Sequence, residues 1–222
     1  MIEFRLPTSE PIRSQSILAL RLLAVCIWIA LFAGFVSSWR GGDEFLLFLI
    51  AIPLVLLIVI SGSGVLIFEA LSQCGRYETR LFMALGLGLG PALAVTALLS
   101  FLPVAWVAGW LGDLSRIAVE HRRYEAIIAE YSASPRPEWF AEQCGITFNV
   151  DPGPPVRVAF NPGGFLDNWS GIIHDPSGEV MLADGFDEQG GFRAPDRITR
   201  IFGGDLVRCR WLWGDYYSCS FT

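Results

Sequence analysis

Residues 45–68 read FLLFLIAIPLVLLIVISGSGVLIF, a continuous run of apolar and small residues without a charged side chain. A helix that crosses a bilayer needs about 20 such residues. Two further runs, Leu22–Val36 and Leu81–Trp110, are also uncharged, and Ile17–Leu20 can extend the first of them. We therefore expect an N-terminal tail at residues 1–16 and three transmembrane helices at about residues 17–38, 45–68 and 81–110.

Composition supports a membrane protein and separates the two halves of the chain. The sequence is 53% hydrophobic with a net charge of −6. Six arginines balance six acids before residue 111, whereas ten arginines and sixteen acids follow it. An acidic C-terminal half gives no electrostatic reason to bind nucleic acid. All sixteen basic residues are arginine, which is typical of a GC-rich bacterial genome.

The flanking charges predict where the chain lies. Sixteen mostly polar residues precede the first run without a cleavage site after it, so we expect a true span and not a cleaved signal. Five arginines flank the spans on the N-terminal side of the membrane and four on the other. For a bacterial inner membrane protein, the positive-inside rule then favours a cytoplasmic N-terminus and a periplasmic C-terminal domain.

The spans resemble an anchor more than a transport pathway. Pumps and channels need intramembrane charges or unwound polar backbone, and Arg21 and Glu69 lie near the ends of the spans. Gly86 and Gly90 have the small-xxx-small spacing of a close helix contact. A hinge before Pro91 is the alternative interpretation of these glycines.

Residues 111–134 are predicted to form a juxtamembrane amphipathic helix that continues the third span. Its apolar stripe has heptad-like spacing and ends before two prolines. The stripe could form a coiled-coil stalk between protomers or pack on its own domain. The stripe consists of Leu114, Ile117, His121, Tyr124, Ile128 and Tyr131.

Residues 135–222 are predicted to form a small, mainly antiparallel β domain, which makes the whole chain α+β. Short β-prone segments alternate with turn signals, and Asp175–Gly178 is expected to join two strands as a hairpin. A short helix is expected at Pro195–Phe202. The expected strands are Ile146–Val150, Val156–Phe160, Trp169–His174, Glu179–Ala183, Asp205–Trp213 and Tyr216–Thr222.

The last two segments allow a prediction of register. Odd positions are apolar in both, so a three-residue turn at Trp213–Asp215 keeps the apolar side chains on one face. Cys209 then faces Cys219, while Trp211 faces Tyr217 and Val207 faces Phe221. Facing cysteines can form a disulfide in an oxidising compartment, and two buried thiols are the alternative.

No catalytic or metal-binding motif stands out. Cys144 and His174, oriented by Asp167 or Asp175, form the best available nucleophile pair, without a local signature to support it. Ser170 lacks the Gly-x-Ser-x-Gly setting. The two histidines and the absence of Cys-x-x-Cys argue against zinc, so we expect no metal and no cofactor. The segments 184–188 and 161–164 are interpreted as a solvated acidic loop and a turn.

Trp139, Trp169, Trp211 and Trp213 give the C-terminal domain a high aromatic load. If several are exposed, they indicate a surface for a partner or for lipid headgroups. The leading hypothesis is a non-enzymatic, membrane-anchored binding or assembly module. Its partners would be the lipid bilayer and another membrane or periplasmic protein, or a second copy. The alternatives are a thiol enzyme that uses Cys144 and His174, and an oligomeric channel or transporter accessory subunit.

Overall fold

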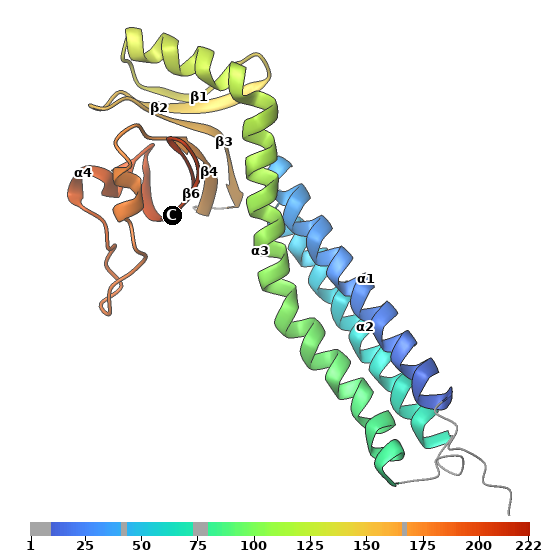
Figure 1. Ribbon diagram of the computed structural model, residues 1–222. Coiled ribbons are helices and arrows are strands. Elements are labelled where there is room, and N and C mark those ends of the chain that lie inside the picture. Colours follow the sequence, from blue (N-terminus) through green and yellow to red (C-terminus); the bar gives the residue numbers. More distant parts are fainter. Residues whose placement is uncertain (1–9, 41–43, 73–79, 166–167) are drawn as a thin grey trace, which may run out of the picture. The chain divides into compact units, whose positions relative to one another are not determined.

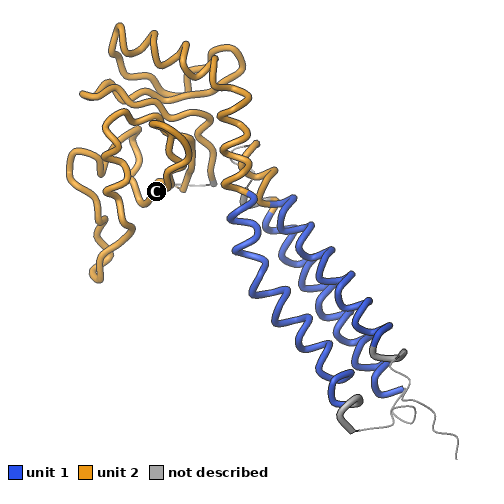
Figure 2. Tube along the Cα trace, viewed as in Figure 1, with its two compact units in different colours: residues 1–33, 48–108 blue, residues 34–47, 109–222 orange. Residues whose placement is uncertain are grey.

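The computed structural model describes residues 10–40, 44–72, 80–165 and 168–222, so residues 1–9 of the expected tail lie outside it. Three long helices precede a curled antiparallel sheet, which confirms the predicted α+β class (Figure 1). The helices are α1 (Glu10–Arg40), α2 (Glu44–Ser72) and α3 (Arg80–Ala133). The chain divides into two compact units, residues 1–33 with 48–108 and residues 34–47 with 109–222 (Figure 2).

The first unit buries small side chains and exposes large apolar ones. Ala30, Ala97 and Ala105 lie in its core, while Trp28 and Leu99 are more than two-thirds exposed. Large apolar side chains are stable in this position when lipid tails surround them. Within the described residues, three helices are long and apolar enough to cross a membrane. These observations identify a multi-pass membrane protein.

Gly90 permits a close contact between α2 and α3 in this unit. A Cβ atom at Gly90 would lie 2.9 Å from the Ser63 carbonyl oxygen, and Ser63 Oγ donates a hydrogen bond to the Gly90 carbonyl at 2.9 Å. Gly86 is buried as well. Gly88, on another face of α3, has open space around it. The small-xxx-small pair therefore lies on the packed side of the helix.

The second unit contains all the described strands in one sheet, ordered β1-β2-β3-β4-β7-β6-β5 with antiparallel neighbours. Apolar residues alternate between the two faces of its strands, so each face has its own core. The strands are β1 (Glu138–Gln143), β2 (Ile146–Asp151), β3 (Arg157–Phe165), β4 (Asn168–His174), β5 (Arg200–Ile201), β6 (Gly204–Trp213) and β7 (Tyr216–Phe221).

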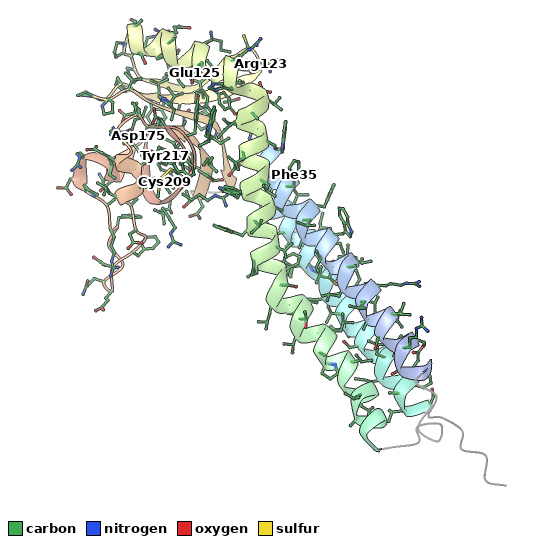
Figure 3. All side chains as sticks on the ribbon, in the orientation of Figure 1. Phe35, Arg123, Glu125, Asp175, Cys209 and Tyr217 are labelled. Atoms are coloured by element: carbon green, nitrogen blue, oxygen red, sulfur yellow. A yellow bond between two sulfur atoms is a disulfide. The ribbon has the colours of Figure 1, made fainter. Side chains whose placement is uncertain are left out.

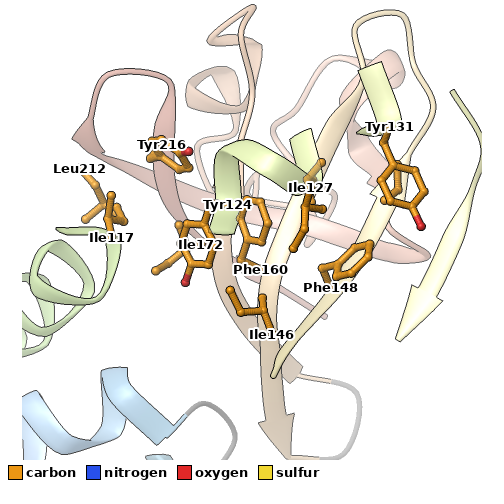
Figure 4. Packing of buried hydrophobic residues seen from close by; sticks show 12 residues of the cluster. Ile117, Tyr124, Ile127, Tyr131, Ile146, Phe148, Phe160, Ile172, Leu212 and Tyr216 are labelled. Carbon is orange, nitrogen blue, oxygen red and sulfur yellow. The ribbon is translucent and has the colours of Figure 1, made fainter. Parts of the chain in front are cut away.

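The helix-side core lies between the C-terminal part of α3 and the sheet (Figure 4). Tyr124 stacks on Phe160, with ring centroids 4.0 Å apart. The predicted apolar stripe of α3 thus packs on the sheet of its own domain, together with Ile127. This packing agrees with the second of the two interpretations of the stripe, and not with a stalk between protomers. The core comprises Ile117, Tyr124, Ile127, Tyr131, Ile146, Phe148, Val150, Val158, Phe160, Ile172, Leu212 and Tyr216.

The far-side core is covered by short elements where the sequence predicted a strand and a longer helix. Glu179–Ala183 was expected as a strand but contains the 3₁₀ helix η2 (Glu179–Leu182). Asp175–Gly178 consequently leads into η2 and makes no hairpin, and β4 pairs with β7. The expected helix at Pro195–Phe202 is only α4 (Asp196–Thr199), followed by β5. Val180 in η2 and Ile198 in α4 are both buried against the sheet. Each element needs to bury only one side chain, and a single helical turn is long enough for that.

The β6–β7 hairpin differs from the predicted register at both ends. Cys209 faces Cys219 and Trp211 faces Tyr217 as expected, but Leu206, not Val207, faces Phe221. The turn is the two-residue Gly214–Asp215. Register shifts between Trp211 and Trp213 and between Leu206 and Arg208 restore the central pairing. Each β-bulge adds one residue to β6 and so moves the following side chains to the other face. The prediction of one unbroken apolar face was therefore wrong.

Candidate functional site

The sheet does not bring Cys144 and His174 together. Cys144 and Gly145 form the two-residue turn between β1 and β2, both with positive φ, as a type I′ turn requires. Val158 of β3 pairs with Val150 on one side and with His174 on the other, so His174 and Val150 lie at the same height in the sheet. Cys144 lies six residues from Val150, about 20 Å along a strand. Direct proton transfer between the two side chains is not possible at such a separation, and Asp167 lies outside the described residues.

Asp175, the other candidate orienting group, belongs to a buried ion-pair network instead. Its carboxylate binds Arg157 Nε at 3.1 Å and accepts hydrogen bonds from the Ser177 hydroxyl and the Val180 N–H. Arg157 also reaches Glu179 at 3.1 Å. Burial raises the pKa of Asp175, but the hydrogen bonds and the Arg157 charge outweigh it and hold that pKa below its usual value. The network fastens η2 to the sheet, and Asp175 is engaged in it and does not orient His174.

Both histidines of the chain lie against Tyr216, between α3 and the sheet. The His174 ring is 5.3 Å from the Tyr216 ring, and the His121 ring is 5.2 Å from that of Trp213. Tyr216 donates a hydrogen bond to Glu125 at 2.8 Å. Burial lowers the pKa of His174. The histidines therefore act as packed aromatic residues between helix and sheet.

The remaining polar candidates are parts of strands or turns. Ser170 lies within β4, and Asn161–Gly164 lies within β3 at a register shift where a turn was expected. Asp187 accepts hydrogen bonds from the Gln189 and Gly191 N–H groups, which closes its loop locally. In the part of the chain that the structure describes, no three His, Cys, Asp or Glu side chains are grouped to hold a metal ion.

Cys209 and Cys219 form a disulfide across the β6–β7 pair, within the far-side core (Figure 3). Their Cα atoms are 4.1 Å apart, close to the spacing of a non-hydrogen-bonded antiparallel pair. Cys26 and Cys144 are free. The disulfide links two strands that already pair, so it stabilises the domain and takes no part in a thiol site.

The tryptophans distinguish core from surface. Trp169 stacks on Phe221 at 3.9 Å, whereas Trp139, Trp211 and Trp213 are each more than half exposed. Large aromatic side chains are enriched at protein interfaces. These three residues, and the neighbouring Phe140, are the strongest surface candidates of the domain.

Strand β1 forms one of these surfaces, here called the β1 edge and comprising Trp139 and Phe140. It is a terminal strand of the sheet, so one side of its backbone has no strand neighbour among the described residues. Phe140 is 70% exposed and adopts φ 48°, which is unfavourable for a bulky residue. The buried Asn149 side chain accepts a hydrogen bond from the Phe140 N–H at 2.6 Å and stabilises this conformation.

The connection from α3 holds the β1 edge in place. Arg136 binds Glu130 on α3 at 2.7 Å and Glu138 on β1 at 3.3 Å, and its guanidinium lies 4.2 Å from the Tyr131 ring centroid. Trp139 packs closely over Gly203, where any side chain would collide with it. This strand was not predicted, because its bulge interrupts the alternation of apolar and polar side chains. The Cys144-Gly145 turn before Ile146 was the available signal.

A scan against protein-family models, a search of curated proteins and a search of solved structures found no match to this chain. The structure itself defines the class, a multi-pass membrane protein with a β-rich domain that has a core on each face of its sheet. Its candidate binding surfaces are exposed aromatic residues.

Proposed function

We propose that this protein is a membrane-anchored, non-enzymatic binding or assembly module whose β1 edge contacts a protein partner. The observation that carries the proposal is Phe140, an exposed aromatic residue held in a strained conformation by a hydrogen bond to the buried Asn149 side chain. Strain that the surrounding structure maintains is characteristic of functional positions. Trp139 adds a second exposed ring beside it.

The outer side of the β1 backbone, which has no strand neighbour in the described part of the chain, fits an extended segment of that partner. An added strand would gain main-chain hydrogen bonds from the edge, and the two aromatic rings would supply apolar contact area. The partner is another protein of the same membrane compartment or a second copy of this chain. Neither Cys144 nor His174 is needed for such binding.

We further propose a bacterial inner membrane location with the β-rich domain in the periplasm. The disulfide Cys209–Cys219 supports an oxidising compartment for this domain. The five-to-four arginine count supports the same orientation. A cysteine-reactive, membrane-impermeant reagent that labels the exposed Cys144 in intact spheroplasts would agree with it, and labelling only after lysis would contradict it.

Site-specific photo-crosslinking in cells tests the binding proposal. A photoreactive amino acid replaces Glu142, an exposed position on β1, and the matched control replaces the half-exposed Arg193 in a loop. Adducts at position 142 that contain a defined protein, are absent at position 193 and are lost in the double variant W139A/F140A would support the proposal. The same adducts at both positions, or none at 142, would contradict it.

The two rivals make different predictions. A thiol enzyme would lose its cellular function in C144S, whereas the binding module would not. A channel or transporter accessory subunit would change conductance or uptake in reconstituted bilayers, and a binding module alone would produce neither change.

A further inference from the structure

The ends of two apolar helical runs meet at one level in the second compact unit. Trp39 ends the apolar run of α1, and Trp110 lies at the end of that of α3, three residues before the first ionisable side chain, Asp113. Trp39 Nε1 donates a hydrogen bond to Ser115 Oγ at 2.9 Å. Tryptophan at the end of an apolar run is the usual residue of the membrane–water interface.

Strand β6 is fastened to α3 at this level. Arg210 Nη2 binds Asp113 Oδ2 at 2.8 Å, and Trp110 Nε1 lies 3.5 Å from the carbonyl oxygen of Trp211. The two tethers join consecutive residues of β6 to positions within one turn of α3. The backbone of Trp211 is therefore held beside Trp110.

The Trp211 ring has the properties of an interfacial side chain. It is 54% exposed, and its Nε1–H donates to the Gly214 carbonyl at 3.0 Å, so its polar atom is satisfied within the hairpin. We propose that Trp211 inserts its ring into the headgroup region of the bilayer beside Trp110, so that this part of the β-rich domain rests on lipid. The inference is independent of the β1 edge and of its partner.

Contacts with successive positions of α3 show that the other exposed tryptophans lie further from Trp110 than Trp211 does. Trp213 is two residues, at most about 7 Å, further along β6 than Trp211, on the side away from Trp110, because its ring contacts His121, eleven residues further along α3. Arg136 ties β1, and with it Trp139, to Glu130, about 30 Å along the same helix. The headgroup layer is only about 5–8 Å thick on each side of the hydrocarbon. Trp211 lies within that layer, Trp213 lies near its outer edge, and Trp139 lies well beyond it.

Lipid quenching of tryptophan fluorescence tests the proposal on the full chain. The protein is reconstituted in phosphatidylcholine–phosphatidylglycerol vesicles with or without bromine near the headgroup end of the acyl chains. The variants W211F, W213F and W139F each remove one ring, and the difference from the unchanged protein gives the emission of that tryptophan. Thermal unfolding of each variant verifies its fold.

We expect bromine to suppress most of the Trp211 emission, to suppress the Trp213 emission less, and to leave the Trp139 emission nearly unchanged. Aqueous acrylamide should show the opposite order. Trp211 emission that is insensitive to bromine would overturn the proposal, as would equal quenching of all three tryptophans. If W211F unfolds, W211Y replaces it, because tyrosine also favours the interface and its weaker emission still isolates the Trp211 signal.

Discussion

Replacing Arg157 with alanine should destabilise the β-rich domain strongly. Arg157 is 3% exposed and binds Asp175, which is fully buried, together with the partly buried Glu179. Its removal leaves the Asp175 carboxylate with hydrogen bonds but no countercharge. Breaking a buried ion pair in this way costs about 3–5 kcal/mol. We expect that loss in the free energy of unfolding, followed by tryptophan fluorescence of the detergent-solubilised protein in urea.

Arg197 is a matched control because it binds the same glutamate. Its Nε lies 2.9 Å from Glu179, but its side chain is more than half exposed. Exposed ion pairs contribute about 0–1 kcal/mol, so R197A should have little effect. The double variant R157M/D175N should be more stable than R157M alone, since it removes the uncompensated charge and keeps one oxygen that can accept either the Ser177 or the Val180 N–H.

Equal and small effects of R157A and R197A would refute this reasoning. That result would mean that water or a neighbouring cation reaches Asp175 in the folded domain. A double variant no more stable than R157M would likewise show that packing, and not charge, accounts for the cost.

Three further predictions concern other parts of the chain. G90A should destabilise the helical unit by about 1–3 kcal/mol because its Cβ meets the backbone of α2, whereas G88A should be neutral or stabilising; thermal unfolding in detergent compares the two. The pKa of His174 is lowered from 6.5 by burial, so the unfolded chain binds a proton that the folded chain does not; stability should fall as pH drops below about 7, and H174F should weaken that dependence in melts from pH 8 to 5. The Cys209–Cys219 bridge closes a sequence separation of 10, worth roughly 2–3 kcal/mol; reductant should lower the melting temperature of the unchanged protein and not of C209A/C219A, and equal shifts would contradict this.

The membrane helices could be predicted because their signal is local. A long uncharged run has few alternatives in a protein chain, and α2 begins within one residue of its predicted start at Phe45. The pairing of Cys209 with Cys219 was also predicted, from alternation in the central part of two adjacent segments, although the turn and the strand ends differ from that prediction. Both features depend on neighbours in sequence.

The features that depend on distant residues could not be predicted. The β-bulge at Leu212 allows β6 to pack against α3 on one face and against the far-side core on the other. It cannot be predicted without knowing both of these neighbours. Strand β1 was missed because Phe140 breaks alternation with a conformation that Asn149 stabilises from the next strand. The Arg157–Asp175 pair joins residues 18 apart, and no single segment indicates it.

The strand order has a consequence for the sequence of folding events. Strand β7 is made after β6 but lies between β4 and β6. While the chain is being synthesised, the β4 edge, with Ile172 and Ile173 on its two faces, stays without its neighbour. An open apolar edge of this kind invites pairing with another chain. The domain thus has a vulnerable interval that ends when β7 inserts, and a chaperone that shields strand edges would be most useful during that interval.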